Sequence, residues 1–150
     1  MSIKLMFATL AASCLLAGLF SRPGKAVEPG PVDADAPKEF TKTASGLKYK
    51  VLRKTDGKKP AATDKVTVHY KGWLDSGKEF DSSYGRGEVI SFRLNQVVKG
   101  WTEGLQLCPE GGMIELEIPS NLGYGPGGTP DGTIPGGATL HFLVELKKIN

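Results

Sequence analysis

The sequence predicts an α+β domain in which a curled antiparallel β-sheet wraps around one short α-helix. Five separate runs alternate between apolar and polar residues, a pattern typical of strands with one buried and one exposed face. Between them, a single segment carries its apolar residues at helical spacing instead. The chain has 150 residues, enough for one domain and a tail. A sheet with one apolar face can bury that face by curving around the helix.

The first 26 residues have the pattern of a secretion leader. An uncharged run from residue 5 to 20 follows a basic residue, and it is shorter than the ~20 apolar residues that a membrane span needs. Gly24 and Ala26 are small residues suited to cleavage after position 26, although a lysine separates them. We expect residues 1–26 to be a signal peptide or an uncleaved N-terminal anchor, and the protein to be periplasmic or secreted. A lipoprotein alternative would acylate Cys14, but the apolar run continues past it.

Residues 27–43 are predicted to form a disordered tether before the domain. The stretch from Val27 to Phe40 has three prolines and four acidic residues in 14 positions, with little apolar surface to bury. Such a segment cannot offset the conformational entropy that it would lose on folding. The folded domain is therefore expected to span residues 44–150.

The five alternating runs locate the predicted strands. In each run, every second residue is apolar and is expected to face the core. His69 and His141 fall at outward-facing positions and are expected to be ordinary surface or edge histidines. Residues 75–78 have the composition of a hairpin turn. The expected core-facing sets are Leu47, Tyr49 and Val51; Val66, Val68 and Tyr70; Ile90, Phe92 and Leu94; Ile114, Leu116 and Ile118; and Leu140, Phe142, Val144 and Leu146.

Helical spacing is found between Asn95 and Pro109. Val98, Trp101 and Leu105 follow one another at intervals of three and four residues, so they lie on one face of a helix. Asn95 is predicted to cap the helix, and Pro109, followed by two glycines, is predicted to end it.

A glycine-rich loop is predicted at residues 123–137, which contain seven glycines and three prolines. Connections of this length are uncommon in compact domains unless they are functional or disordered. Tyr124 and Ile134 are large side chains that a purely flexible loop would not need. We therefore interpret the segment as a binding loop.

Charge and cysteine content argue against several classes of function. Three of the 19 basic residues lie in the leader, so the remainder equals the 16 acidic residues, and no basic surface for nucleic acid is expected. Cys108 is the only cysteine beyond the leader, so neither an internal disulfide nor a cysteine-rich metal site is predicted. The sequence GYGPGG lacks the Gly-Lys-Ser/Thr of a phosphate-binding loop, and the histidines stand in no hydrolase motif. No cofactor or metal is expected.

Four motifs follow one another along the predicted domain. They are VHYKGWLDSGKEFDSS (68–83), VVKGWTEGLQL (97–107), LGYG (122–125) and IPGGATLHFLVEL (134–146). Together they resemble the FKBP (tacrolimus-binding) family of peptidyl-prolyl cis-trans isomerases, and the resemblance covers residues 46–150. It implies a half-barrel of antiparallel strands around one short helix, in agreement with the apolar pattern.

The resemblance also implies roles for individual residues. Three are implied to be catalytic: Asp81 beside the substrate carbonyl, Trp101 at the floor of the pocket, and Tyr124 with its hydroxyl toward a carbonyl. The backbone N–H of Val98 is implied to bind the peptide. The implied substrate-binding set is Tyr70, Phe80, Ile90, Val97, Val98, Trp101, Tyr124, Ile134 and Phe142.

The sequence departs from the family pattern at three places in this site, one of which is Gly136 and Gly137 after Pro135, where a second proline is common. Ile90 stands where members often carry phenylalanine, and residues 129–132 replace a segment that contains a histidine in some members. These departures bear on substrate preference and macrolide affinity rather than on the reaction.

The implied activity is rotation about X–Pro bonds in exported polypeptide clients. No covalent bond breaks in this reaction, so no nucleophile, metal or general base is needed, and an apolar pocket can lower the barrier by excluding water. Macrolides such as tacrolimus or rapamycin are further implied ligands. Nucleic acid is not an expected partner, a membrane is expected only if the leader is uncleaved, and a monomer is expected.

Two alternative functions are weighed against this enzyme. One is a non-catalytic module that binds proline peptides or acts as a chaperone on the same pocket. The presence of Asp81, Trp101 and Tyr124 together favours the enzyme over it. The other is a small β-domain that binds single-stranded nucleic acid, and the neutral charge of the domain speaks against it.

Overall fold

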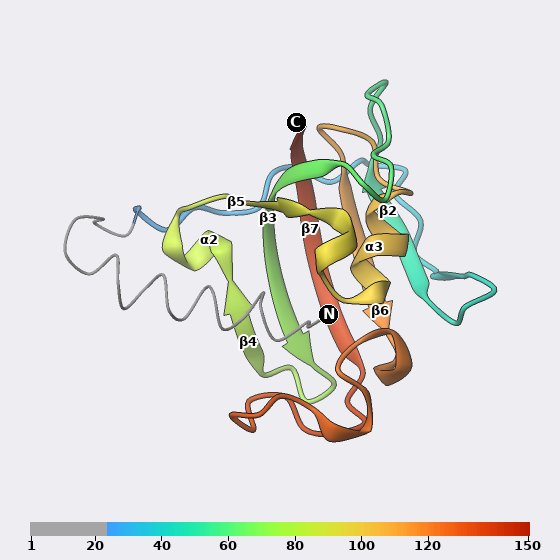
Figure 1. Cartoon of the computed structure of the whole chain (residues 1–150). Coiled ribbons are helices and arrows are strands. Elements are labelled where there is room, and N and C mark those ends of the chain that lie inside the picture. Colours follow the sequence, from blue (N-terminus) through green and yellow to red (C-terminus); the bar gives the residue numbers. More distant parts are fainter. Residues whose placement is uncertain (1–23) are drawn as a thin grey trace.

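The computed structural model describes residues 24–150, so most of the predicted leader lies outside the described residues. Seven strands form one antiparallel sheet that curves around the helix α3 (Figure 1). The described strands and α-helices, in chain order, are β1 (Thr41–Lys42), β2 (Lys48–Arg53), β3 (Lys65–Leu74), β4 (Glu79–Ser82), α2 (Ser83–Arg86), β5 (Ile90–Arg93), α3 (Lys99–Leu105), β6 (Met113–Ile118) and β7 (Leu140–Ile149). This architecture confirms the predicted fold class.

The sheet is built around its two longest strands. β3 and β7, of 10 residues each, pair along most of their length, and the strand order is β1-β2-β6-β7-β3-β4, with β5 also pairing to β3. The hairpin predicted at residues 75–78 connects β3 to β4, with the amide of Gly77 donating to the Leu74 carbonyl. β1 and β4 were not predicted: β1 has only two residues, and β4 (Glu79–Ser82) contains a single apolar residue, Phe80, so neither shows an alternating pattern.

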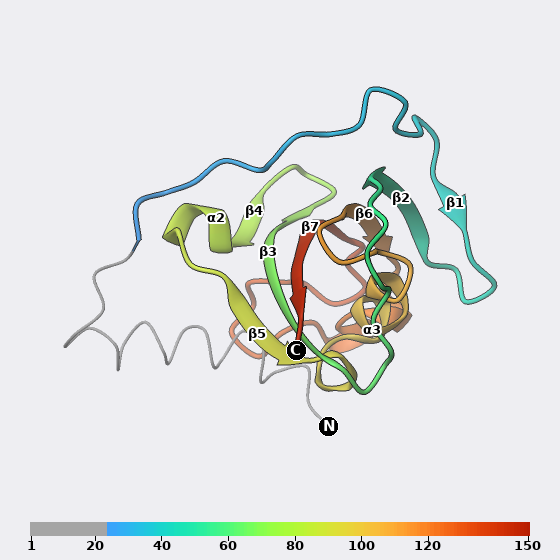
Figure 2. The same ribbon diagram turned by 90° about the horizontal axis from the view of Figure 1, so that it is seen from above.

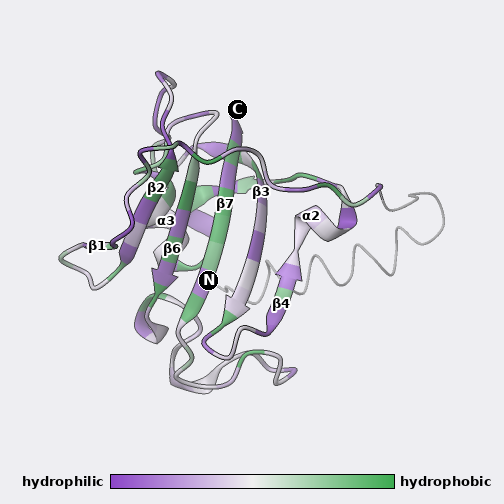
Figure 3. Cartoon of the chain, turned by 180° about the vertical axis from the view of Figure 1, so that it is seen from behind, coloured by the Kyte–Doolittle hydropathy of each residue, from purple (hydrophilic) through white to green (hydrophobic). Residues whose placement is uncertain are grey.

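Alternation along the strands separates a buried inner face from a partly polar outer face. Figure 3 shows the resulting bands of hydrophobic and hydrophilic residues on the central strands. Apolar residues on the inner face form one core, and most of the predicted core-facing side chains are fully buried in it. Tyr49, Val51, Ile90 and Phe92 lie at its margin and are half-buried.

α3 packs unusually close to the sheet. Gly100 and Gly104 face β6, where an added Cβ would lie 2.6 Å from a side-chain carbon of Ile118 and of Leu116, respectively. Glycine at these two positions therefore lets the helix approach the strand backbone. At seven residues, α3 is the longest helix described, and no helix within residues 24–150 is long and apolar enough to cross a bilayer.

The prediction of where the helix begins was wrong. Asn95 lies in a 3₁₀ turn (Leu94–Gln96), and α3 starts only at Lys99. Val97 has extended backbone angles (φ −119°, ψ 179°) and Val98 has non-helical angles (φ −51°, ψ 144°), so these two residues separate the turn from the helix. No side chain caps α3, but the hydroxyl of Thr102 donates to the Leu94 carbonyl at 2.6 Å and ties the helix to the turn.

The prediction that His69 is an ordinary surface or edge histidine was also wrong, because it is buried. The single helical turn α2, which the sequence pattern did not predict, covers this histidine and leaves it 9% exposed. Nδ1 of His69 lies 2.8 Å from Oγ of Ser83, and its ring stacks on Tyr84 with centroids 4.8 Å apart. His141 is half-buried and pairs with Asp75.

The segment before β1 follows the domain instead of extending freely from it. Figure 2 shows it running from beside α2 to β1. The amide of Val27 donates to the Tyr84 carbonyl at 3.0 Å, and the amide of Asp33 donates to the Leu52 carbonyl at 2.8 Å. This course differs from the predicted disordered tether, because its peptide groups find hydrogen-bond partners on the domain.

Candidate active site

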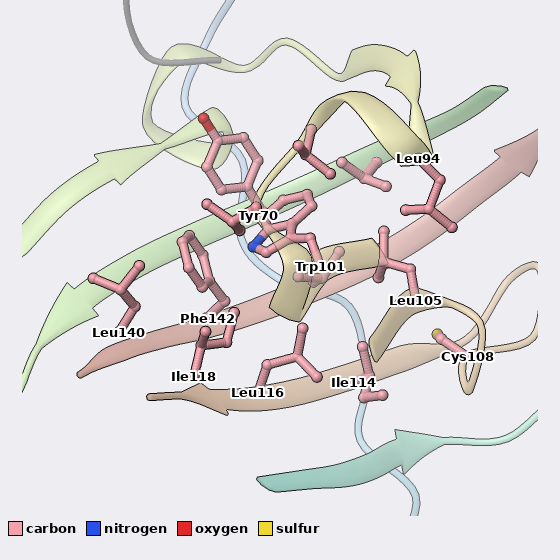
Figure 4. Packing of buried hydrophobic residues seen from close by; sticks show 14 of the residues in the cluster. Tyr70, Leu94, Trp101, Leu105, Cys108, Ile114, Leu116, Ile118, Leu140 and Phe142 are labelled. Atoms are coloured by element: carbon pink, nitrogen blue, oxygen red, sulfur yellow. The ribbon is translucent and has the colours of Figure 1, made fainter. Parts of the chain in front are cut away.

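Four of the predicted site residues form one aromatic cluster. Trp101 comes from α3, Phe142 from β7, Tyr70 from β3 and Phe80 from β4. Ring centroids of Trp101 and Phe142 lie 5.1 Å apart at 90°, those of Trp101 and Tyr70 5.2 Å apart at 82°, and those of Phe80 and Phe142 5.5 Å apart at 88°. These are favourable edge-to-face arrangements. Figure 4 shows Tyr70, Trp101 and Phe142 grouped together.

The cluster changes from buried to accessible along its length. Tyr70, Trp101 and Phe142 are almost completely buried, whereas Phe80 on β4 is partly exposed. The ring of Phe80 therefore gives the cluster an apolar margin that reaches solvent. A ligand that contacts this margin would meet aromatic rings that the sheet and the helix already hold in place.

Gly72 makes room for this cluster on β3. It stands opposite Asp81 on β4 and Phe142 on β7. A Cβ at position 72 would lie 2.6 Å from Cζ of Phe80 and 2.7 Å from Cε1 of Phe142, closer than carbon atoms can pack. The two rings can meet over β3 only because residue 72 has no side chain. Sequence reasoning missed this residue, although a glycine inside a strand often marks such a close approach.

An ion pair between Asp81 and Arg86 lies beside the aromatic rings. Nη1 of Arg86 donates to Oδ1 of Asp81 at 2.5 Å, the hydroxyl of Tyr70 donates to Oδ2, and the Asp81 side chain is only 10% exposed. Burial and the nearby Asp81 charge raise the pKa of Tyr70, so Tyr70 remains a donor. Burial opposes the charge of Arg86, but its hydrogen bond to Asp81 keeps its pKa raised. Arg86 was not predicted from the sequence, since one arginine in a polar stretch carries no signal.

The glycine-rich loop brings Ile134 to the core through a tight turn. Oγ1 of Thr129 donates to Oδ1 of Asp131 at 2.7 Å, and it accepts the amide of Ile134 at 3.0 Å. The Asp131 carboxylate also accepts the amide of Thr133 at 3.0 Å. Ile134 is buried as a result, although no regular element carries it. Thr129 and Asp131 were noted only as a departure from the family pattern and were not predicted to support the site.

Tyr124 remains a protonated hydrogen-bond donor in the same loop. Burial raises the pKa of its hydroxyl, and the charges of Asp81 and Asp131 raise it further. The Tyr124 hydroxyl is therefore influenced by Asp81 beside the aromatic cluster and by Asp131 in the glycine-rich loop.

Trp101 has a buried donor without a partner. Its indole Nε1 is buried, and no acceptor among residues 24–150 hydrogen-bonds to it. Buried polar groups without partners are rare in folded proteins, and each calls for an explanation. A carbonyl oxygen of a bound ligand is one group that would satisfy this indole.

The other predicted site residues border the same core. Val97 and Val98 are buried just before α3, and Ile90 on β5 packs against the core while remaining half-buried. Val98 occupies the N-cap position, where the first amides of a helix lack partners within the helix. The backbone N–H implied to bind a peptide therefore belongs to the residue at the start of this helix.

The described part of the chain holds no group of three or more His, Cys, Asp or Glu side chains suited to a metal ion. Cys108 is buried, and burial raises the pKa of its thiol to about 12, so it stays protonated at neutral pH. The site thus offers an apolar aromatic surface. It is bordered by the Asp81 carboxylate, the Tyr124 hydroxyl and the Trp101 indole N–H.

Comparisons with known proteins give a consistent assignment. Residues 56–147 match the family described as FKBP-type peptidyl-prolyl cis-trans isomerase. The chain is 52% identical to the isomerase FkpA of Aeromonas hydrophila over 117 residues, covering 77% of the chain and 43% of that protein. It is 51% identical to FkpA of Escherichia coli K12 over 112 residues, covering 74% and 41%. The chain thus spans less than half the length of these curated relatives.

Solved structures agree with the sequence comparisons. The crystal structure of Escherichia coli FkpA superimposes with a TM-score of 0.72 at 47% identity, covering 76% of this chain and 53% of that one. A peptidyl-prolyl cis-trans isomerase from Pseudomonas syringae gives a TM-score of 0.68 at 32% identity, covering 97% of this chain and 96% of that one. The similarity to the Pseudomonas syringae structure therefore extends over nearly the whole chain.

Proposed function

The chain belongs to the family of FKBP-type peptidyl-prolyl cis-trans isomerases, and from this premise we propose that it catalyses rotation about the X–Pro peptide bonds of polypeptide clients. The observation that carries the proposal is the aromatic cluster of Trp101, Tyr70, Phe142 and Phe80, which is buried at one end and partly exposed at the other. A proline ring is a compact apolar group that matches such a surface.

The physical basis is the polarity of the amide. Rotation of the X–Pro bond passes a barrier of about 18–20 kcal/mol because resonance is lost in the twisted state, and without a catalyst it takes tens to hundreds of seconds. A planar amide is more polar than a twisted one, so an apolar surface that excludes water disfavours the ground state more than the transition state. Each tenfold acceleration needs only about 1.4 kcal/mol of this difference.

The polar groups at the margin would then fix the substrate. In our proposal, the hydroxyl of Tyr124 and the amide of Val98 hold carbonyl groups on either side of the rotating bond. The proline ring enters at the partly exposed Phe80, and the buried Trp101 forms the floor of the site. Asp81 lies beside the rotating carbonyl, with both of its oxygens already engaged by Tyr70 and Arg86. A carboxylate held in this way can act on the substrate electrostatically without taking a proton.

The ligands and the location follow from the same site and from the leader. We propose Tyr70, Phe80, Ile90, Val97, Ile134 and Phe142 as walls of the substrate site. Macrolides such as tacrolimus or rapamycin would compete for these walls. The pattern of residues 1–26 supports export to the periplasm or secretion, where unfolded proteins with slow X–Pro bonds are the clients, and we propose that the protein acts as a monomer.

A protease-coupled assay on a proline peptide tests this function with the full chain. The wild-type protein should accelerate the slow phase, and tacrolimus should suppress the acceleration. Tyr124→Phe should lower the rate several-fold with little effect on folding, because it removes one hydroxyl that holds the substrate. Tyr49→Phe is the matched control: Tyr49 is a half-buried tyrosine on β2, outside the site, and its rate should equal wild type.

Two results would count against the proposal. A wild-type chain that is folded but leaves the slow phase unchanged would refute the enzymatic function. A Tyr124→Phe variant as active as Tyr49→Phe would remove the hydroxyl from the proposed mechanism. If the chain binds the peptide without accelerating rotation, the non-catalytic binding module becomes the correct assignment.

A further inference from the structure

A polar clasp lies on the outer face of the sheet, away from the aromatic cluster. Its centre is Glu145 on β7, which is only 2% exposed although it is charged. Its carboxylate accepts hydrogen bonds from Nη2 of Arg53 at 2.7 Å, from the hydroxyl of Tyr84 at 2.7 Å and from the amide of Gly30 at 2.9 Å. Burial alone would raise the pKa of Glu145, but these bonds and the charge of Lys147 lower it to about 2.

The third of these donors comes from the segment before β1. We call residues 24–36 the strap, because they run over the domain from α2 to β2 (Figure 2). The carbonyl of Pro31 accepts a second bond from Arg53, at 2.9 Å. A side chain at Gly30 would displace the clasp: a Cβ there would lie 2.8 Å from Nη1 of Arg53 and 2.9 Å from Oε2 of Glu145, so the ends of these two side chains would have to move. The strap is thus fitted to the clasp.

The start of the strap holds α2 in place. The amide of Val27 donates to the carbonyl of Tyr84, and Gly24 packs so tightly on Gly87, the C-cap of α2, that an added Cβ would lie 2.6 Å from the Gly87 oxygen. α2 has only four residues, and an isolated helix of this length is unstable in water. Its position therefore depends on contacts such as these.

α2 links the clasp to the candidate active site. Two residues apart on this turn, Tyr84 bonds to Glu145 of the clasp, and Arg86 bonds to Asp81 beside the aromatic cluster. Any shift of α2 that loosens Tyr84 must also move Arg86, because one helical turn joins them. The carboxylate of Asp81 has Arg86 as its charged partner.

We propose that the strap is a positioning element for catalysis: by closing on Glu145 and on α2, it sets the place of Arg86 and, through Arg86, the orientation of Asp81. This inference rests on the proposed isomerase function. It assigns a role in the reaction to Gly30, Arg53, Tyr84 and Glu145, none of which belongs to the aromatic cluster. These are positioning residues, because they act through Arg86.

A double-mutant cycle on the full chain tests the coupling. Gly30→Val should push the strap off the clasp and lower kcat/KM about tenfold, since small displacements of a positioned group cost activity. In an Arg86→Met background, where Asp81 keeps its bond from Tyr70 but has lost its charged partner, the same substitution should change kcat/KM by less than about twofold. Asp35→Ala is the matched strap control: it removes only an exposed ion pair with Lys54 and should behave as wild type.

All variants should be assayed at temperatures well below their thermal unfolding midpoints. Under these conditions, a substitution that lowers only the stability leaves the activity unchanged. Tyr84→Phe provides a second route, because it breaks the link from α2 to Glu145 without adding volume, and it should lower kcat/KM in the same direction. Equal losses from Gly30→Val in the wild-type and Arg86→Met backgrounds would overturn the proposal, as would full activity of both Gly30→Val and Tyr84→Phe.

Hydrogen exchange separates this inference from the function on which it rests. The amides of Gly85 and Gly87 bond within and beside α2, and they should exchange faster in Gly30→Val than in Asp35→Ala. Unchanged exchange at both glycines would refute the role of the strap even if the wild-type enzyme is active. An inactive wild-type protein would instead refute the proposed function, whatever the exchange shows.

Discussion

The aromatic half of the site and the glycine-rich loop are held in place by different means. Tyr70 and Phe142 lie on β3 and β7, whose backbones pair in register over most of their length. Ile134 reaches the core through two short side chains, Thr129 and Asp131, and through glycines such as Gly128, whose φ is 66°. Changes to the sheet half should therefore affect folding and activity together, whereas changes to the loop should affect activity alone.

Trp101→Ala should produce the largest effect, because Trp101, on α3, is the fully buried centre of the aromatic cluster. Truncation of a large buried aromatic residue costs about 3–5 kcal/mol of unfolding free energy. Chemical denaturation should show this loss, and the proline-peptide assay should show near-complete loss of activity in the fraction that remains folded. A Trp101→Ala protein of wild-type stability would mean that the two halves do not differ as described.

The second largest difference between the sheet and the loop should appear in how the unfolding free energy depends on pH. The pKa of Glu145 is lowered to about 2 in the folded chain, from a usual value of 4.5. As the pH falls below 4.5, the unfolded chain therefore binds a proton that the folded chain does not. The stability that Glu145 contributes is present above pH 4.5 and is lost as the pH falls toward 2. His69 acts in the same direction: burial and the charge of Lys147 lower its pKa, so acidification below about pH 6.5 also favours the unfolded chain.

Glu145→Gln should therefore lower the unfolding free energy at pH 7 by about 3 kcal/mol and flatten its decline between pH 4.5 and 2. The measurement is denaturant unfolding at a series of pH values. In the loop, hydrogen bonds from Thr129 and Thr133 lower the pKa of Asp131, but this carboxylate is exposed, and Asp131→Asn should leave the pH dependence of unfolding as in wild type. A steep acid dependence that survives in Glu145→Gln would contradict this assignment.

Alanine substitution at two glycines, one in the sheet and one in the loop, should give a smaller difference in unfolding free energy. Gly72→Ala should force Phe80 and Phe142 apart and cost about 1–3 kcal/mol of unfolding free energy, as overpacking of a core does. Gly127→Ala in the loop meets no atom within 4 Å and should change the unfolding free energy by less than about 0.5 kcal/mol. Similar thermal midpoints for the two variants would show that the sheet half is as tolerant as the loop.

Asp131→Ala should give the smallest change in stability and a selective change in activity. Without the Asp131 acceptor, the turn that presents Ile134 should loosen, so KM for a proline peptide should rise several-fold while the thermal midpoint stays as in wild type. Asp131→Asn keeps an oxygen at Oδ1 and should restore the wild-type KM. Equal KM values for all three proteins would show that Ile134 is held without this turn.

The sequence predicted the strands of the sheet, but not the contacts that Arg86 and Gly72 make beside the site. Alternating residues such as Val66, Val68 and Tyr70 predicted the sheet and its buried face, because side-chain direction along a strand depends only on local geometry. Arg86 and Gly72 could not be assigned in this way, since their roles depend on side chains from β4 and β7 that approach them only after folding.

The segment before β1 shows the limit of composition. Its prolines and acidic residues are typical of disorder, yet Gly30 and Asp33 hydrogen-bond to the domain. The burial of His69 was missed for a similar reason: alternation placed it on the outer face correctly, but nothing in the strand pattern indicated that one turn of helix would cover that face.

Exchange NMR on a short X–Pro peptide tests the central claim most directly, because it measures cis–trans interconversion without a coupled protease. With the full chain at substoichiometric concentration, exchange between the cis and trans signals should become much faster than in the free peptide, and tacrolimus should return it to the uncatalysed rate. If the peptide signals instead broaden through binding while the cis–trans exchange rate stays that of the free peptide, the aromatic cluster binds proline without catalysing rotation.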